Sequence, residues 1–368
     1  MKIPLYKPYI SKKEVNAVLR VLKSSKLSRG REVEYFEKDF AKYTNQKYAI
    51  AVNSGTSGLH LLVRAMGWKK GDEVITTPFS YVASSNALLF EDVTPVFVDI
   101  DLKTFNIDPL KIEEKITPQT KGILLVHILG LPADYEAIKK IKDKYNLQII
   151  EDACEAIGKP DNDFLVTKLG EATVYGFHEN KPLTSGGEGG MIVTDDLIIA
   201  QKCWSMRDQG RSTEKDWINH VTLGFNFRMT EMQAAFGNSQ LKNIDRILKR
   251  REEIANLYVS LLKDSNQLVI PYSLKHKRSW FFFFIILPNV KIRDRICKRL
   301  TECEIGSIAN FFPPIYTFPM YAKYAQSYFH NTEKVSKTLL ILPMFYNMQD
   351  KEVKKVAMVV RSVLKNNG

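Results

Sequence analysis

The stretch that decides the fold runs from Tyr48 to Met66 and reads YAIAVNSGTSGLHLLVRAM. Its first five residues are apolar and predict a buried strand, and apolar residues at helical spacing begin at Leu59. A strand that turns directly into a helix presents free backbone N–H groups, which, with the hydroxyls of Thr56 and Ser57, suit a phosphate dianion. Such a turn on its own is more often an ordinary strand-to-helix connection.

Six further apolar runs predict strands along the first two thirds of the chain. They cover residues 73–76, 96–100, 122–127, 147–150, 173–177 and 190–194. Helical patterns connect most of these runs, which is typical of an α/β domain with a sheet between helices. We expect a large domain of this class, with seven strands, over residues 1–245.

The pattern changes after the charged helix predicted at residues 242–262. A strand is predicted from Trp280 to Leu287, a helix from Ile292 to Cys303 and a final helix near Asp350. We therefore expect a smaller α+β C-terminal domain over residues 246–368.

Two segments of the large domain carry reactive side chains near predicted strand ends. Lys181 lies on a loop before the glycine-rich stretch 186–190, and Asp152 directly follows the apolar run 147–150. A lysine amine can condense with the aldehyde of pyridoxal phosphate (PLP), and a carboxylate can keep its pyridine nitrogen protonated. A lone lysine is usually a surface charge, and an aspartate after a strand is usually a helix cap. Together with the Ser-Gly-Thr-Ser-Gly turn, however, they favour a PLP site, because ligands gather outside strand carboxyl ends.

At these residues the chain resembles the DegT/DnrJ/StrS family of PLP-dependent nucleotide-sugar aminotransferases. The matching segments are 3–5, 28–30, 52–60, 71–75, 94–100, 151–156, 180–181, 187–190 and 224–229. The resemblance implies the aspartate aminotransferase fold type I, with a seven-stranded, mostly parallel sheet between helices. It also implies PLP as the cofactor, with pyridoxamine phosphate (PMP) as the intermediate form.

The resemblance assigns roles to individual residues of this chain. Lys181 and Asp152 are the expected catalytic residues, Tyr81 is expected to stack on the cofactor ring, and Glu155 to contact the ring oxygen or nearby substrate. Asn226 matches a residue that reaches the phosphate of the neighbouring subunit, so a homodimer with a shared active site is expected. The full set of expected cofactor-binding residues is Gly55, Thr56, Ser57, Tyr81, Asp152, Glu155, Lys181 and Asn226.

Three residues fall where relatives approach the sugar, namely Tyr6, Glu188 and Tyr316. A packed tyrosine or a solvated glutamate explains these positions equally well. The chain departs from the family at Tyr316, where many relatives have histidine, and at Gly176, where relatives often have a phosphate-binding serine or threonine.

The resemblance predicts that an amino group passes from glutamate or glutamine to a nucleotide-linked keto-deoxysugar. The product would be an amino sugar for a surface polysaccharide, such as lipopolysaccharide, or for a glycosylated metabolite. A lysine at position 181 favours this reaction over sugar dehydroxylation, because the relatives that remove a hydroxyl have histidine there. The alternatives are a dehydratase or epimerase that uses the same imine chemistry, and a non-catalytic regulatory homologue.

Composition is consistent with a globular enzyme of 368 residues, 45% hydrophobic and 26% charged. The apolar run 280–287 is too short to span a membrane, and the N-terminus lacks an apolar signal stretch, so the cytoplasm is expected. The four cysteines show no metal-site or disulfide spacing, and no metal is expected. The net charge of +12 is scattered; it predicts a solvated basic surface, or attraction of an anionic diphosphate substrate, rather than nucleic-acid or membrane binding. His60 and His127 are expected to be structural.

Overall fold

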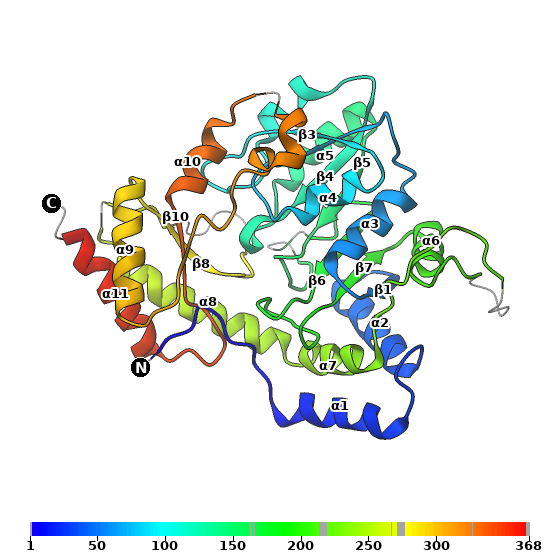
Figure 1. Cartoon of the computed structure of the whole chain (residues 1–368), viewed down its shortest axis with the longest axis horizontal. Helices are drawn as coiled ribbons and strands as arrows, with labels where there is room; N and C mark the ends of the chain where they lie inside the picture. The colour runs from blue at the N-terminus through cyan, green and yellow to red at the C-terminus, as the bar shows by residue number, and fades with distance from the viewer. Residues whose placement is uncertain are drawn as a thin grey trace.

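The computed structural model describes residues 2–161, 164, 166–212, 219–265, 267–270, 277–325 and 327–365. A large mixed sheet forms the centre of the molecule, with helices on both of its faces (Figure 1). Its strands are β1 (Tyr48–Val52), β2 (Glu73–Thr76), β3 (Thr94–Phe97), β4 (Thr120–Val126), β5 (Gln148–Asp152), β6 (Ala172–Gly176) and β7 (Gly190–Thr194).

The order of the strands across this sheet is β1-β7-β6-β5-β4-β2-β3. The neighbours from β6 to β3 pair in parallel, whereas β7 runs antiparallel to both β1 and β6. The prediction of a seven-stranded, mostly parallel sheet is therefore confirmed. The strand predicted at residues 96–100 lies earlier, at 94–97, because it pairs in register with β2 from Glu73 to Thr76.

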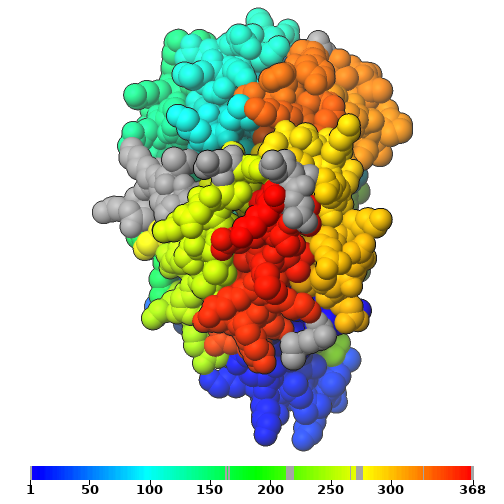
Figure 2. All heavy atoms as spheres, turned by 90° about the vertical axis from the view of Figure 1, so that its left-hand side faces the viewer, coloured from blue at the N-terminus to red at the C-terminus, as the bar shows by residue number. Residues whose placement is uncertain are grey.

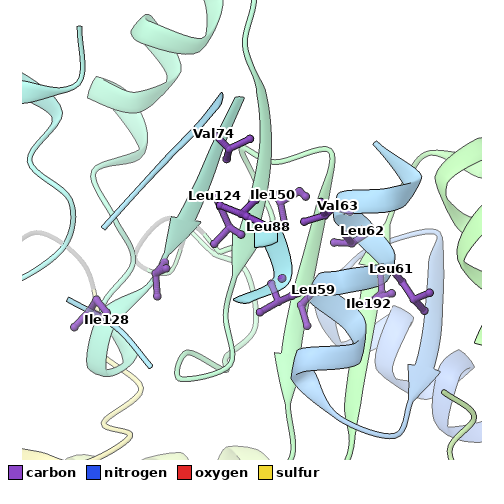
Figure 3. Close-up of a cluster of buried hydrophobic side chains, with 14 of the residues drawn as sticks. Leu59, Leu61, Leu62, Val63, Val74, Leu88, Leu124, Ile128, Ile150 and Ile192 are labelled. Carbon is purple, nitrogen blue, oxygen red and sulfur yellow. The ribbon is translucent and has the colours of Figure 1, made fainter. Parts of the chain in front are cut away.

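Side chains alternate between two hydrophobic cores along each central strand. On β5, Ile150 packs into the core that includes Leu59 and Leu62 of α3 (Figure 3). Ile149 joins Ile138 in the core on the opposite face. The period of two follows from strand geometry. Because both faces of the sheet are covered, most of its strands contain short apolar runs, and these runs made the strands recognisable in the sequence.

Helices α3 and α6 cover one face of the sheet, and α2 and α5 cover the other. The helices are α1 (Lys12–Ser24), α2 (Arg31–Thr44), α3 (Gly55–Ala65), α4 (Ala83–Leu89), α5 (Tyr135–Tyr145), α6 (Leu197–Arg207), α7 (Glu231–Leu241), α8 (Ile244–Leu262), α9 (Val290–Glu302), α10 (His330–Thr338) and α11 (Asp350–Lys365). Short 3-10 turns are η1 (Pro109–Lys111), η2 (Glu113–Lys115), η3 (Ile128–Gly130), η4 (Ile315–Thr317) and η5 (Pro319–Tyr324). The pattern Thr230-Glu231-Met232-Gln233 is that of a capping box, and the structure forms one at the start of α7, between Thr230 and Gln233.

A second, smaller antiparallel sheet has the order β8-β10-β9 and consists of β8 (Phe283–Ile286), β9 (Ile308–Ala309) and β10 (Leu339–Leu342). Figure 2 shows α11 on the outer face of this part, flanked by α8 and α9. The strand predicted from Trp280 begins at Phe283, three residues later than expected. Trp280 has a left-handed φ of 51°, and Phe281 and Phe282 pack into the core of the large sheet.

The long helix α8 connects the two parts of the molecule. Its residue Ile247 packs into a core beside the large sheet, whereas Tyr258 packs into the core of the small sheet. The N-terminal segment also crosses between them, since Ile3 forms a bridge with Ile305. A domain boundary at residue 245 would fall at the start of this shared helix and stays a prediction. None of the helices in the described ranges is both long and apolar enough to cross a membrane.

Candidate active site

A cavity of about 370 Å³ lies at the carboxyl ends of β5 and β6, beside the N-terminus of α3. Side chains from the small-sheet part, Phe281, Phe311 and Phe312, complete its wall. The cavity brings together seven of the expected site residues: Gly55, Thr56, Tyr81, Asp152, Glu155, Lys181 and Glu188. Segments far apart in the sequence thus meet where open α/β sheets bind ligands.

One end of the cavity is the start of α3, where Gly55 and Thr56 line the wall. Ser54 is the N-cap: its Oγ accepts a hydrogen bond from the N–H of Ser57 at 3.1 Å and lies 2.9 Å from the Ser57 hydroxyl. Ser57 itself lies outside the lining, so Ser54 is the serine of this turn that lines the cavity. Free N–H groups and the helix dipole make this end suitable for a phosphate.

Asp152, at the end of β5, is buried and held by two donors. Its Oδ2 accepts a hydrogen bond from the Ser84 hydroxyl at 2.7 Å, and its Oδ1 accepts one from the Cys154 N–H at 3.0 Å. The Ser84 hydroxyl lies 2.9 Å from that of Ser80, which also lines the cavity. These bonds fix the direction of the carboxylate toward the cavity.

Lys181 reaches the cavity from the loop between β6 and β7. Its Nζ lies 3.8 Å from Oε1 of Glu155 and 3.7 Å from the centroid of the Phe281 ring. Glu155 is buried, and its Oε2 accepts a hydrogen bond from the N–H of Leu129 at 2.8 Å. Burial raises the pKa of Glu155, although the nearby Lys181 ammonium opposes this effect.

Tyr81 lines the same cavity with 66% of its surface exposed. An exposed aromatic ring at a cavity wall can stack on a planar ligand without loss of existing packing. The set of groups therefore fits PLP: anion-binding N–H groups at one end, a carboxylate and an amine within the cavity, and a free aromatic face. Gly55 fits this too, because a Cβ there would lie 2.7 Å from Sγ of Cys154 and close the corner beside the helix N-terminus.

Four of the expected site residues do not line this cavity, namely Ser57, Tyr6, Tyr316 and Asn226. Tyr6 donates a hydrogen bond to Glu179 at 2.7 Å and lines a small neighbouring cavity with Lys181. Tyr316 donates one to Glu333 at 2.6 Å and packs beside Phe329. Each tyrosine thus has a packed, hydrogen-bonded position, and its role toward the sugar stays a prediction.

Asn226 is exposed and lies outside the cavity of its own chain. Its backbone pairs with Asp208. This position agrees with a side chain that faces outward, but a contact with a neighbouring subunit stays a prediction.

The two histidines near the site in sequence have structural partners. Nδ1 of His127 accepts a hydrogen bond from the N–H of Ala133, so Nε2 carries the proton that is shared with Glu151 at 2.8 Å. His60 is 2.8 Å from Glu91. Neither histidine lines the large cavity.

Several lining residues carry no signal in the sequence. The main ones are Ser84, Phe281, Phe311 and Phe312. Ser84 belongs to a segment rich in small polar residues, and the phenylalanines belong to apolar runs that look like ordinary core. Ser54 and Cys154 were not named as site residues, although Ser54 opens the Ser-Gly-Thr-Ser-Gly turn and Cys154 lies two residues after Asp152.

Comparison with known proteins agrees with this geometry. The sequence model of the DegT/DnrJ/EryC1/StrS aminotransferase family matches residues 8–361. GDP-perosamine synthase of Escherichia coli O157:H7 is 34% identical over 358 residues, which cover 95% of this chain and 95% of that protein.

Solved structures give the same result. PseC from Helicobacter pylori, an aminotransferase involved in the biosynthesis of pseudoaminic acid, matches with a TM-score of 0.94 and 30% identity, over 100% of both chains. NtdA from Bacillus subtilis, solved with bound cofactor PMP, matches with a TM-score of 0.90 and 31% identity, over 97% of this chain and 83% of that chain.

These similarities confirm the predicted fold type, the cofactor PLP and the class of enzyme, a PLP-dependent sugar aminotransferase. The matches extend along nearly the whole chain and include the segments that build the cavity. The chain belongs to the DegT/DnrJ/EryC1/StrS aminotransferase family.

Proposed function

We propose that this enzyme transfers an amino group from glutamate or glutamine to a nucleotide-linked keto-deoxysugar. The observation that carries the proposal is the meeting of Lys181 and Asp152 in one cavity beside the N-terminus of α3. The GDP-sugar enzyme among its relatives supports a nucleotide-linked acceptor. We further propose that the reaction takes place in the cytoplasm and supplies an amino sugar for a surface polysaccharide or a glycosylated metabolite.

The residues of the cavity have separate tasks in this reaction. PLP, when bound, supplies an electron sink for the carbon that loses its proton. The α3 N-terminus and Thr56 would hold the phosphate, and Asp152, oriented by Ser84, would keep the ring nitrogen protonated. Lys181 Nζ would then take the proton from the α carbon of the donor and, as a general acid, deliver it to a carbon of the cofactor.

The position of Glu155 beside Lys181 adds a second group that can hold a proton. Their charged atoms are 3.8 Å apart, close enough for an ion pair when both are charged. The raised pKa of Glu155 favours the neutral acid when the lysine is not charged. Glu155 would in this way remain compatible with an oxygen substituent of the cofactor ring, which a fixed negative charge would repel.

We propose that the enzyme is a homodimer in which each site receives Asn226 from the other subunit. Asn226 is exposed, and two apolar residues nearby in the chain are also exposed, Val221 at 61% and Leu223 at 70%. Exposed apolar side chains next to a polar group of this kind are typical of a surface that a partner covers.

The central test is mass spectrometry of the products from a panel of nucleotide keto-deoxysugars, with ¹⁵N-labelled glutamate or glutamine as donor. We expect the label in an amino sugar. Loss of water or inversion without label would instead identify a dehydratase or epimerase. A cofactor whose absorbance does not change on addition of either donor would identify a non-catalytic homologue.

The lysine assignment has its own test. Lys181→Ala should keep the fold, measured by circular dichroism, but lose the visible absorbance of lysine-bound cofactor. Lys159→Ala is a matched control, since this lysine is exposed and pairs with Asp245 on the surface. An unchanged spectrum in Lys181→Ala would reject the assignment.

A further inference from the structure

The side chain of Cys154 lies between two glycines at the anion-binding end of the cavity. A Cβ at Gly55, the first residue of α3, would lie 2.7 Å from the Cys154 Sγ. A Cβ at Gly176, the last residue of β6, would lie 3.2 Å from both Cβ and Sγ of Cys154. Neither glycine has a positive φ, so the backbone conformation does not require glycine at these positions. A side chain there would first meet Cys154.

Cys154 is also tied to the other end of the cofactor site. Its N–H donates a hydrogen bond to Oδ1 of Asp152, and its side chain lines the cavity. The position of Cys154 thus links the Asp152 carboxylate, the start of α3 and the end of β6. Close-packed interiors transmit small changes of volume, so this contact sets the spacing of the three elements.

We propose that Cys154 is a positioning residue that fills the space left by the missing side chain at Gly176. At the phosphate-binding end of the cavity, the wall next to β6 is then formed by a thiol and not by a hydroxyl. The phosphate would then be held by the N–H groups and hydroxyls of the α3 N-terminus, without a side chain from β6. This inference rests on PLP binding alone, and its test is therefore independent of the sugar and of the amino donor.

The chemistry of the thiol suits this place. Burial raises the pKa of Cys154 well above its usual range, and the Asp152 carboxylate adds to the effect. The side chain is therefore a neutral, compact group that adds no negative charge beside a phosphate. A thiolate or a carboxylate in the same position would repel the anion.

The experiment is a double-mutant cycle with Gly176→Ser, Cys154→Ala and the double variant, in which PLP affinity is measured by absorbance titration and stability by thermal unfolding. We expect Gly176→Ser to weaken PLP binding by about tenfold and Cys154→Ala by less than about threefold. The double variant should bind PLP within about threefold of the wild type, because loss of the Cys154 Sγ leaves room for the serine hydroxyl, and the remaining contact with the Cβ of residue 154 needs only a small shift. The proposal would be overturned if the effects of the two substitutions on the free energy of PLP binding were additive. It would also be overturned if the Gly176→Ser protein bound PLP as tightly as the wild type.

Two further variants separate this effect from general damage. Gly176→Ala adds only the Cβ, so Cys154→Ala relieves its contact with Sγ but not its 3.2 Å contact with the Cβ of residue 154. Cys154→Ala should therefore rescue PLP binding by Gly176→Ala in part, and this can be measured even if the serine variant does not fold. Cys203→Ala removes a buried thiol on α6 that does not line the cavity. It should not rescue either substitution at Gly176, and rescue by Cys203→Ala would show that the coupling is not specific to Cys154.

Discussion

The ammonium group of Lys181 lies 3.7 Å from the centroid of the Phe281 ring. This contact connects the loop after β6 to the segment that leads into the small sheet. Phe281 is itself held by Arg251 of α8, a buried arginine that donates hydrogen bonds to the carbonyl oxygens of Trp280, at 2.8 Å, and of Phe281, at 2.5 Å. Trp280, whose carbonyl oxygen accepts one of these bonds, has a left-handed backbone.

Arg251→Lys should lower kcat about tenfold with a smaller effect on PLP affinity, because one ammonium cannot hold two carbonyl groups in the geometry of a guanidinium. It should also lower the free energy of unfolding by about 2 kcal/mol, since a buried carbonyl loses its donor. Steady-state kinetics and urea unfolding measure the two effects. Arg246→Lys is the control on the same helix, at an exposed position. Equal kinetics for wild type and Arg251→Lys would show that the segment does not depend on this arginine.

Asp152→Asn should reduce kcat by at least about a hundredfold, because an amide cannot stabilise a protonated pyridine nitrogen as a carboxylate does. Ser84→Ala removes one of the two hydrogen bonds to Asp152 and should lower kcat about tenfold. Ser85→Ala is the matched control, because its buried hydroxyl has no hydrogen-bond partner among the described residues. A Ser84→Ala enzyme with wild-type kcat would contradict the role assigned to this hydroxyl.

The pH dependence of stability should show the raised pKa of Glu155. Below its ordinary value of 4.5 the carboxyl is protonated in both the folded and the unfolded chain. As the pH rises from there through the higher pKa of the folded state, ionisation costs stability, so the free energy of unfolding of the cofactor-free protein should fall. Glu155→Gln should remove this fall, which denaturant unfolding at a series of pH values measures.

Glu151 is the natural contrast, because its pKa is shifted in the other direction. Burial disfavours its charge, but the hydrogen bond from His127 and those from the N–H groups of Leu169 and Gly170 outweigh burial and lower the pKa. Its contribution is present above 4.5 and is lost as the pH falls through the folded pKa. Glu151→Gln should therefore reduce the loss of stability as the pH falls, whereas Glu155→Gln should reduce the loss of stability as the pH rises. If both substitutions changed the pH dependence of the free energy of unfolding in the same direction, the environments described for the two glutamates would be wrong.

The shared active site predicts complementation between two inactive variants. A dimer of Lys181→Ala with Asn226→Ala would contain one site with both residues intact, provided that Asn226 comes from the partner subunit. Mixing the subunits should restore about a quarter of wild-type activity, since about half of the dimers are mixed and each has one intact site. Mixtures that stay inactive, although native mass spectrometry shows mixed dimers, would place Asn226 outside the neighbouring site.

The sequence predicted the fold well where local pattern and packing agree. The strands of the large sheet are apolar because both faces are covered, so their runs could be read directly, and the Thr230 capping box marked the start of α7. The strand from Trp280 was predicted too long, because hydrophobicity alone cannot distinguish strand residues from Phe281 and Phe282, which pack against another sheet.

The active site, like the fold, was predicted in part from the sequence and in part only from the structure. The sequence by itself determined the order of the anion-binding turn, Asp152 and Lys181, because each depends on local chemistry at a strand end. Only the tertiary structure decided that Phe281 covers Lys181, that Ser84 orients Asp152 and that Cys154 fills the space beside Gly176. These contacts join residues distant along the chain, and their side chains have no pattern of their own; they meet because the large sheet and the small sheet pack around one cavity.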